Sequence, residues 1–208
     1  MIGRCLTYVT FALATFVLLS GCDFRPPPVS VPKFDPEKIA DEAMKLCDSN
    51  GDGFLDKNEL KTAPGLEFAS KALDENKDKK LSREEVLQRF KDLVEAGSGM
   101  VGFTCFVLRG DGTPLEDAMI KLIPEPFLAE YIPEAEGQTV DYRNGAVNVT
   151  TPNSESASGV RPGMYRVEIR SNTLKIPAKY NDKSVLGVEV IPFTDPNLPP
   201  GGITFVLR

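Results

Sequence analysis

The chain has 208 residues, a formal net charge of −6, a hydrophobic fraction of 41% and neither histidine nor tryptophan. This length suits one or two domains with ordinary hydrophobic cores. The acidic balance, without a long run of Lys and Arg, argues against nucleic-acid binding, which needs a basic face to displace the counterions of the phosphates. The absence of histidine excludes Ser-His-Asp triads, Cys-His pairs and imidazole zinc sites, whereas carboxylate-only chemistry stays open.

The first segment, residues 1–21, has the pattern of an export signal. Arg4 is its one charge, and an apolar run from Tyr8 to Leu19 is followed by small residues. The run is short for a membrane-spanning helix and ends in a processing pattern, which favours cleavage over an uncleaved anchor. The ending LSGC, which includes Cys22, resembles the bacterial lipobox. This resemblance implies a lipid on Cys22 and an exported, membrane-anchored lipoprotein of the cell envelope, facing the periplasm or the cell surface.

Residues 22–34 are rich in proline, which favours extended polyproline geometry, and we expect a semi-rigid tether there. Two further cysteines, Cys47 and Cys105, lie in different predicted segments. An oxidising compartment would allow a disulfide between them, and buried free thiols are at least an equal alternative.

Residues 35–96 show helical periodicity interrupted by two acidic loops. Asp35 and Pro36 make a good helix opening, because an aspartate caps free N–H groups and a proline fits the first turn. The helical pattern then continues to about Cys47. The sequence therefore predicts a small α-helical module here.

The first acidic loop, DSNGDGFLDKNE over residues 48–59, matches the calcium-loop template at every constrained position. Gly53 stands where the backbone needs a positive φ, and the apolar Leu55 stands at position 8. A merely solvated acidic turn would not explain these offsets. The loop therefore resembles the EF-hand family. The ligands expected from the template are Asp48, Asn50, Asp52, the backbone carbonyl of Phe54, Asp56 and the bidentate Glu59.

A second loop, DENKDKKLSREE over residues 74–85, repeats this frame. Its expected ligands are Asp74, Asn76, Asp78, the backbone carbonyl of Lys80, Ser82 and Glu85. Lys79 replaces the usual glycine at a cost of about 1–2 kcal/mol. The loop also has fewer ligand carboxylates than the first, so the first site should bind calcium more tightly. A structural partner without metal is the alternative for this loop. The resemblance to EF-hand pairs implies that Leu55 and Leu81 meet in a short antiparallel bridge.

The sequence favours a structural calcium site over a sensor. Sensors expose a Met-rich groove, whereas Met44 is the only methionine in this module. Pro64 and Gly65 interrupt the segment between the loops, so barely one helical turn should follow the first loop. Sites with dissociation constants of about 10⁻⁴–10⁻³ M would be filled by the calcium available outside the cytoplasm.

Residues 95–100 predict a linker, and residues 101–208 contain several short alternating runs separated by turn signals. The stretches GDGTPLEDAMIKLIPE, GVRPGMYRVEI and KIPAKYNDKSVLGVEV resemble the transthyretin-like (prealbumin-like), carboxypeptidase regulatory-like domain. The resemblance implies an antiparallel β-sandwich of the seven-stranded type that supports or binds rather than catalyses. The related hydroxyisourate hydrolases need histidines and a Tyr-Arg-Gly-Ser tail, and this chain lacks both.

We therefore expect a multidomain protein, α-helical and then all-β, that is not an enzyme. The expected partners are calcium ions, a membrane through the lipid on Cys22, and an envelope protein or glycan, with no nucleic acid. An alternative is an adhesion or carbohydrate-binding module that acts through exposed tyrosines of the β-sandwich, namely Tyr131, Tyr142 and Tyr180. A carboxylate hydrolase in the acidic stretch 125–136 is disfavoured because no partner that would perturb a carboxylate is evident.

Overall fold

The computed structural model describes residues 29–141, 144–152, 158–194 and 202–208. The predicted export signal of residues 1–21, the lipidation site Cys22 and the tether up to residue 28 lie outside these residues. Within the described ranges, the helices are all too short or too polar to cross a bilayer.

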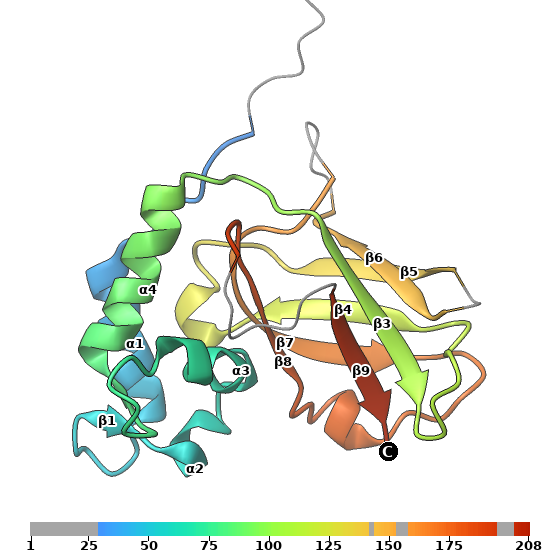
Figure 1. Cartoon of the computed structure of the whole chain (residues 1–208), viewed down its shortest axis with the longest axis horizontal. Coiled ribbons are helices and arrows are strands. Elements are labelled where there is room, and N and C mark those ends of the chain that lie inside the picture. Colours follow the sequence, from blue (N-terminus) through green and yellow to red (C-terminus); the bar gives the residue numbers. More distant parts are fainter. Residues whose placement is uncertain (1–28, 142–143, 153–157, 195–201) are drawn as a thin grey trace, which may run out of the picture.

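Four helices and one small two-stranded sheet form the first part of the molecule (Figure 1). The elements are α1 (Pro36–Cys47), β1 (Phe54–Leu55), α2 (Lys57–Leu60), α3 (Pro64–Leu73), β2 (Leu81–Ser82) and α4 (Arg83–Ala96). The expected start of α1 is confirmed, because the side chain of Asp35 accepts a hydrogen bond from Lys38 N at 3.2 Å and Pro36 is the first helical residue. The single turn expected after the first loop is α2, and Pro64 begins α3.

Seven strands form the second part of the molecule. They are β3 (Phe103–Arg109), β4 (Met119–Pro124), β5 (Ala135–Asp141), β6 (Ala146–Thr150), β7 (Gly163–Arg170), β8 (Gly187–Val190) and β9 (Ile203–Leu207). Two short 3₁₀ helices, η1 (Pro126–Leu128) and η2 (Ala178–Tyr180), lie between strands. The strands join in one hydrogen-bonded sheet in the order β8-β7-β4-β5-β6-β3-β9, so β8 and β9 are its two edges.

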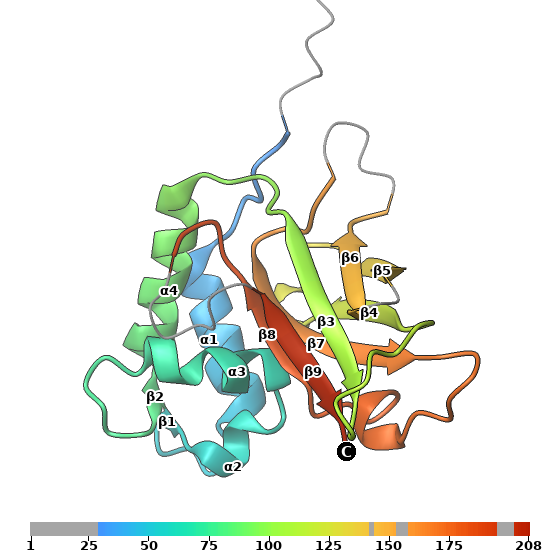
Figure 2. The same ribbon diagram turned by 45° about the vertical axis from the view of Figure 1, so that its right-hand side comes forward.

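The sheet differs in two respects from the antiparallel sandwich that the sequence suggested. Its strands form a single curled sheet, and the curl brings the two edge strands toward each other, since residues of β8 and β9 line the same groove (Figure 2). The expectation of purely antiparallel pairing is wrong for one pair, because β9 runs parallel to β3 with Cys105 opposite Ile203. The reason is topological: the chain leaves β8 at one edge, crosses to the other edge and enters β9 in the direction of β3.

Helix α3 packs closely against β7 and β8, and two glycines allow this approach. A Cβ atom on Gly187 would lie 1.8 Å from the carbonyl oxygen of Pro64, and one on Gly65 would lie 2.6 Å from the backbone nitrogen of Tyr165. Buried side chains of both parts belong to one continuous hydrophobic cluster. The domain boundary predicted at the linker of residues 95–100 stays a prediction, but the parts on either side of it share a core.

Two buried carboxylates of the sheet contact the helices. Glu189 in β8 accepts hydrogen bonds from Arg89 in α4, at 2.7 Å to each carboxylate oxygen. Glu125, which follows β4, is fully buried and its Oε1 accepts a hydrogen bond of 2.6 Å from Gly65 N. Glu125 thus caps the first turn of α3. The N-cap residue of this helix, Ala63, has no side-chain acceptor of its own.

The described end of the proline-rich segment lies against the body of the protein. Arg161 donates hydrogen bonds to the backbone oxygen of Ser30, to Ser30 Oγ at 3.2 Å, and to the carbonyl of Gly99 at 2.8 Å. The ring of Phe34 lies 5.9 Å from the rings of both Phe90 and Tyr131. Residues 29–34 are therefore fastened at the junction between the helices and the sheet.

The two cysteines in the described ranges are free and buried. Cys47 ends α1 and Cys105 lies within β3. Of the two sequence-based alternatives, the buried free thiols are confirmed.

Candidate metal centre

The loop between α1 and β1 is folded around its own acidic side chains. Asp48 Oδ1 accepts a hydrogen bond from Gly51 N at 2.7 Å, and its Oδ2 accepts one from Gly53 N at 3.0 Å. Both glycines have positive φ, 73° at Gly51 and 83° at Gly53, a conformation that costs glycine little. Asn50 Oδ1 and Asp52 Oδ1 accept hydrogen bonds from the backbone N–H two residues further on. The local sequence thus fixes the orientation of each candidate ligand.

Glu59 closes this loop from helix α2. Its side chain is buried, and Oε1 accepts hydrogen bonds from Ser49 N at 3.0 Å and Asn50 N at 3.2 Å. Its Oε2 accepts one from Asp56 N at 2.9 Å, while Asp56 Oδ1 accepts one from Glu59 N at 3.1 Å, which is a reciprocal capping box. The single turn of α2 therefore holds Glu59 over the loop.

Three carboxylates converge in this loop. One oxygen from each of Asp48, Asp52 and Glu59 lies within 4.8 Å of the other two, a spacing that can hold a metal ion. Asp56, also predicted as a ligand, lies outside this group, and its carboxylate caps α2. The predicted Asn50 and the carbonyl of Phe54 belong to the same loop, and Phe54 begins β1. All of these donor groups are oxygens, as hard divalent cations require.

The loop between α3 and β2 has the same hydrogen-bonding frame. Asp74 accepts hydrogen bonds from Asp78 N at 3.1 Å and Lys79 N at 3.0 Å, and Asp78 Oδ1 accepts one from Lys80 N at 2.8 Å. Asn76 Oδ1 accepts one from Asp78 N at 2.8 Å. The backbone N–H groups of this loop are therefore hydrogen-bonded to its acidic and amide side chains in the same pattern as in the first loop.

Glu85 closes the second loop as Glu59 closes the first. Its Oε1 accepts a hydrogen bond from Glu75 N at 3.1 Å, and its Oε2 accepts one from Ser82 N at 2.8 Å. Ser82, predicted as a ligand, caps α4 by accepting a hydrogen bond from Glu85 N. Among the described residues, however, only the first-loop carboxylates come together closely enough to form a metal-sized group.

Lysines occupy the two strained backbone positions of the second loop. Lys77 and Lys79 have φ values of 62° and 69°, and they stand where Gly51 and Gly53 stand in the first loop. Of the non-glycine residues that the structure describes, these two alone have positive φ. A side chain in this region costs about 1–2 kcal/mol per residue, which makes the second loop the more strained of the two.

The two loops are joined by the β1–β2 pair. Leu55 lies opposite Leu81 in antiparallel register, and both side chains are fully buried. This pairing confirms the contact expected from the sequence. The two residues stand at equivalent positions of the loops, so the backbone of one loop is hydrogen-bonded directly to the backbone of the other.

An ion pair that sequence reasoning missed connects the loops on their exposed side. Lys80 Nζ in the second loop lies 3.2 Å from Asp52 Oδ2 in the first, and 5.4 Å from the centre of the Phe54 ring. The hydrogen bonds from Phe54 N–H and from Lys80 hold the pKa of Asp52 below its usual range, and the bond to Asp52 raises that of Lys80. The two residues are 28 positions apart, and only the register of β1 with β2 brings them together.

The tyrosines that the alternative adhesive function would use are poorly placed for that role. Tyr180 is buried, which corrects the expectation of exposure, and its hydroxyl donates a hydrogen bond of 3.0 Å to Arg208 O. Tyr131 is half-buried and lies against Phe34. Tyr142 lies outside the described residues.

Three of the four acids in the stretch 125–136 have structural partners. Glu125 is buried and caps α3, Glu130 pairs with Lys38, and Glu134 lies 2.7 Å from Lys121 Nζ. These three acids therefore have structural partners, and the metal-sized group in the first loop is the better candidate site.

Comparison of the chain with protein-family models, with curated proteins and with solved structures gives no match. The two loops carry the features that bear on function: the converging oxygens of the first, the repeated hydrogen-bonding frame of the second and the strand pair that joins them.

Proposed function

We propose that this protein is a non-enzymatic calcium-binding lipoprotein of the bacterial cell envelope. In this proposal a lipid on Cys22 anchors it, residues 35–96 form a pair of EF-hand-type loops, and residues 101–208 form a transthyretin-like support or interaction module. The observation that carries the calcium assignment is the convergence of Asp48, Asp52 and Glu59 within the first loop.

The chemistry of the donors favours calcium over softer metals. The candidate ligands of both loops are carboxylate, amide, hydroxyl or backbone carbonyl oxygens, and the chain has no histidine. Calcium accepts six to eight such oxygens in flexible geometry, whereas zinc and copper favour nitrogen and sulfur donors. The two cysteines in the described ranges are buried outside the loops and supply no thiolate to them.

The geometry supports a structural role for the ion. The carboxylates of the first loop repel one another, and a bound divalent ion would turn this repulsion into attraction. The exit helix α2 is a single turn and is held by Glu59, so it offers little surface that could open as a groove. An ion that binds only the folded state stabilises it by mass action, about 2.7 kcal/mol at a hundredfold excess over the dissociation constant.

The proposal is tested by calorimetric titration of the purified full chain with calcium, alongside thermal unfolding in calcium and in chelator. We expect heat of binding and a higher melting temperature in calcium. Magnesium at the same concentration should give a smaller shift, because it demands stricter octahedral geometry. An absence of binding heat together with an unchanged melting temperature would refute the calcium assignment.

A further inference from the structure

A groove of about 380 Å³ is lined by residues of α3, the start of β8 and the edge strand β9. Figure 2 shows these three elements next to one another. Its accessible lining is mostly apolar: Val185 is 59% exposed, and Phe68, Leu186 and Ile203 are half-buried. A smaller hollow of about 190 Å³ also includes Ile203 and extends to Gly202, so the two hollows together follow one side of β9.

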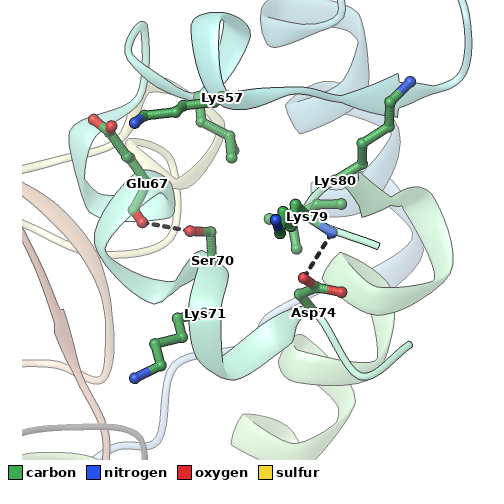
Figure 3. A pocket seen from close by; sticks show the side chains of 9 residues that line it. Lys57, Glu67, Ser70, Lys71, Asp74, Lys79 and Lys80 are labelled. Carbon is green, nitrogen blue, oxygen red and sulfur yellow. Dashed lines mark hydrogen bonds between the residues drawn. The ribbon is translucent and has the colours of Figure 1, made fainter. Parts of the chain in front are cut away.

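The groove carries little net charge. Among the described residues that line it, only Glu67 is charged. Figure 3 shows the side chain of Lys57 extending toward Glu67, which offsets this charge. An uncharged, partly apolar ligand therefore suits the groove better than an ion or a phosphate group.

Strand β9 presents backbone groups on the side that faces away from β3. Within a strand, the N–H and C=O groups of one residue point to the same side, and successive residues alternate between the two sides. The N–H of Arg208 donates to the hydroxyl of Tyr180 and its C=O accepts from the same hydroxyl, each at 3.0 Å. Since Tyr180 belongs to η2 and not to β3, Arg208 faces away from β3, and so do Val206 and Thr204.

This edge of β9 is only partly covered. Tyr180 occupies it at Arg208, whereas the outward N–H and C=O groups of Thr204 and Val206 have no hydrogen-bond partner among the described residues. Natural edge strands are commonly protected by charged residues, prolines or bulges. Strand β9, with the sequence ITFVL, has no charge and no proline, and it pairs with β3 in unbroken register. Such an edge is a template for a further strand.

We propose that the groove binds an extended segment of another protein, which adds to the sheet as a strand along β9. The free backbone groups of Thr204 and Val206 would bond to those of the segment, whose residues repeat at about 3.3 Å. Alternate side chains of the segment are apolar and would lie against Phe68 and Val185. This inference goes beyond the proposed function and does not depend on calcium, because none of the residues that line the groove is a candidate ligand.

The walls of the groove favour a single segment over a second copy of this chain. Residues of α3 and the exposed Val185 stand across the groove from β9. A single added strand needs a spacing of only about 4.8 Å from β9. Pairing of β9 with the β9 of another copy would instead bring the α3 walls of both copies into the same space.

The test measures fluorescence anisotropy with the full chain in non-ionic detergent, in calcium and in chelator. The probe is a short fluorescein-labelled peptide in which valine and threonine alternate between terminal lysines. We expect saturable binding with dissociation constants that agree within twofold in the two buffers. The control peptide has the same sequence with an N-methyl group on every valine and threonine. It keeps the side chains and charges but loses the backbone donors, and should bind at least tenfold more weakly.

Two pairs of variants locate the site. Thr204→Pro removes an outward N–H that does not bond to β3, and should weaken binding at least tenfold, whereas Thr204→Ala keeps this N–H and should change binding less than twofold. Val185→Glu places a charge in the apolar groove and should also weaken binding at least tenfold. Val140→Glu is its matched control, because Val140 is 56% exposed and lies outside the groove. Circular dichroism checks folding, and Val185→Glu decides if Thr204→Pro does not fold.

The outcomes separate this proposal from its alternatives. An absence of saturable binding, or equal binding of the N-methylated peptide, would overturn it. Equal losses for Val185→Glu and Val140→Glu would place the binding outside the groove. Self-association of the chain that Thr204→Pro abolishes, without peptide binding, would show that a second copy occupies the edge. If calorimetry finds no calcium binding while the peptide binds as expected, the proposed function fails and this inference stands.

Discussion

At the scale of single residues, the two loops show how one backbone frame is obtained from different side chains. In the first loop, Gly51 and Gly53 adopt positive φ, whereas in the second Lys77 and Lys79 are forced into it. The hydrogen bonds from backbone N–H groups to Asp48 and to Asp74 are nevertheless equivalent. The second loop therefore stores strain that the first does not.

Replacing Lys79 with glycine should relieve this strain. We expect Lys79→Gly to stabilise the protein by about 1 kcal/mol and to tighten calcium binding at the second loop, since the loop would be better organised for the ion. Urea unfolding and calorimetric titration measure the two effects. Lys61→Gly, at an exposed position with helical φ after α2, is the control and should not stabilise. A Lys79→Gly variant no more stable than Lys61→Gly would contradict the strain argument.

Glu59 and Glu85, which close the two loops, should contribute unequally to the affinity for calcium. We expect Glu59→Gln to weaken calcium binding at the first loop by roughly tenfold or more, and to cost more total affinity than Glu85→Gln, because only the first-loop acids converge. Calorimetry of both variants measures the difference. Glu84→Gln, an exposed neighbour outside the ligand frame, is the matched control. Equal losses for Glu59→Gln and Glu85→Gln would show that the ranking of the sites is wrong.

At the scale of elements, features set by neighbouring residues could be predicted from the sequence. Features set by contacts between distant segments could not. The start of α1 follows from Asp35 and Pro36, and the Leu55–Leu81 pairing follows from the repeated loop frame. The parallel pairing of β9 depends on how the chain crosses between the edges of a curled sheet, which no alternation pattern encodes. Likewise, the contact of Gly187 with Pro64 and the Lys80–Asp52 pair arise only from tertiary arrangement.

Glu125 caps the first turn of α3, and the sequence around Glu125 does not predict this contact. Burial raises the pKa of Glu125 to about 7 from its usual 4.5, against the lowering effects of the Gly65 N–H and of Arg166. The folded state therefore holds this proton more tightly than the unfolded state does. As far as this group is concerned, the free energy of unfolding should be highest below pH 4.5, should fall by about 3 kcal/mol between pH 4.5 and 7, and should be constant above that range.

The substitution Glu125→Gln should remove this pH dependence while keeping an oxygen acceptor for Gly65 N. We expect the variant to be more stable than the natural protein at pH 8, by on the order of 1–3 kcal/mol, and similar to it near pH 5. Urea unfolding at both pH values measures this, with Glu116→Gln, at an exposed position, as the control. A stability difference that stays constant between the two pH values would exclude Glu125 as the titrating group.

At the scale of the whole molecule, the helices and the sheet are held together by a shared core and by buried polar contacts. Helix α3 lies on β7 and β8, and Arg89 in α4 pairs with the buried Glu189 of β8. These contacts join the segment that carries the loops to the segment that carries the sheet. A stabilising ion in the loops should therefore stabilise the sheet as well.

We accordingly expect thermal unfolding of the two parts in one transition. Circular dichroism at 222 nm reports mainly on the helices and tyrosine near-ultraviolet signals report on the sheet, and chelator should lower both midpoints by the same amount. Two separate transitions, of which chelator shifts only the helical one, would show that the two parts unfold independently.

The anchor proposed for the whole molecule can be tested by metabolic labelling. Cells that express the chain and are fed radioactive palmitate should incorporate label into it, and Cys22→Ser should abolish the incorporation. Cys5→Ser is the control, because residue 5 lies in the segment expected to be removed. Label that persists in Cys22→Ser would place the lipid elsewhere.

The contacts of Arg161 also have a mechanical consequence. Arg161 donates hydrogen bonds to both Ser30 and Gly99. Tension applied to the chain before residue 29 would therefore act on these bonds before it acts on α1. Load is thereby divided between the sheet and the segment that follows α4, at the end of the helices away from the loops. A pull on the proposed tether would thus act where the helices and the sheet meet, away from the proposed ion sites.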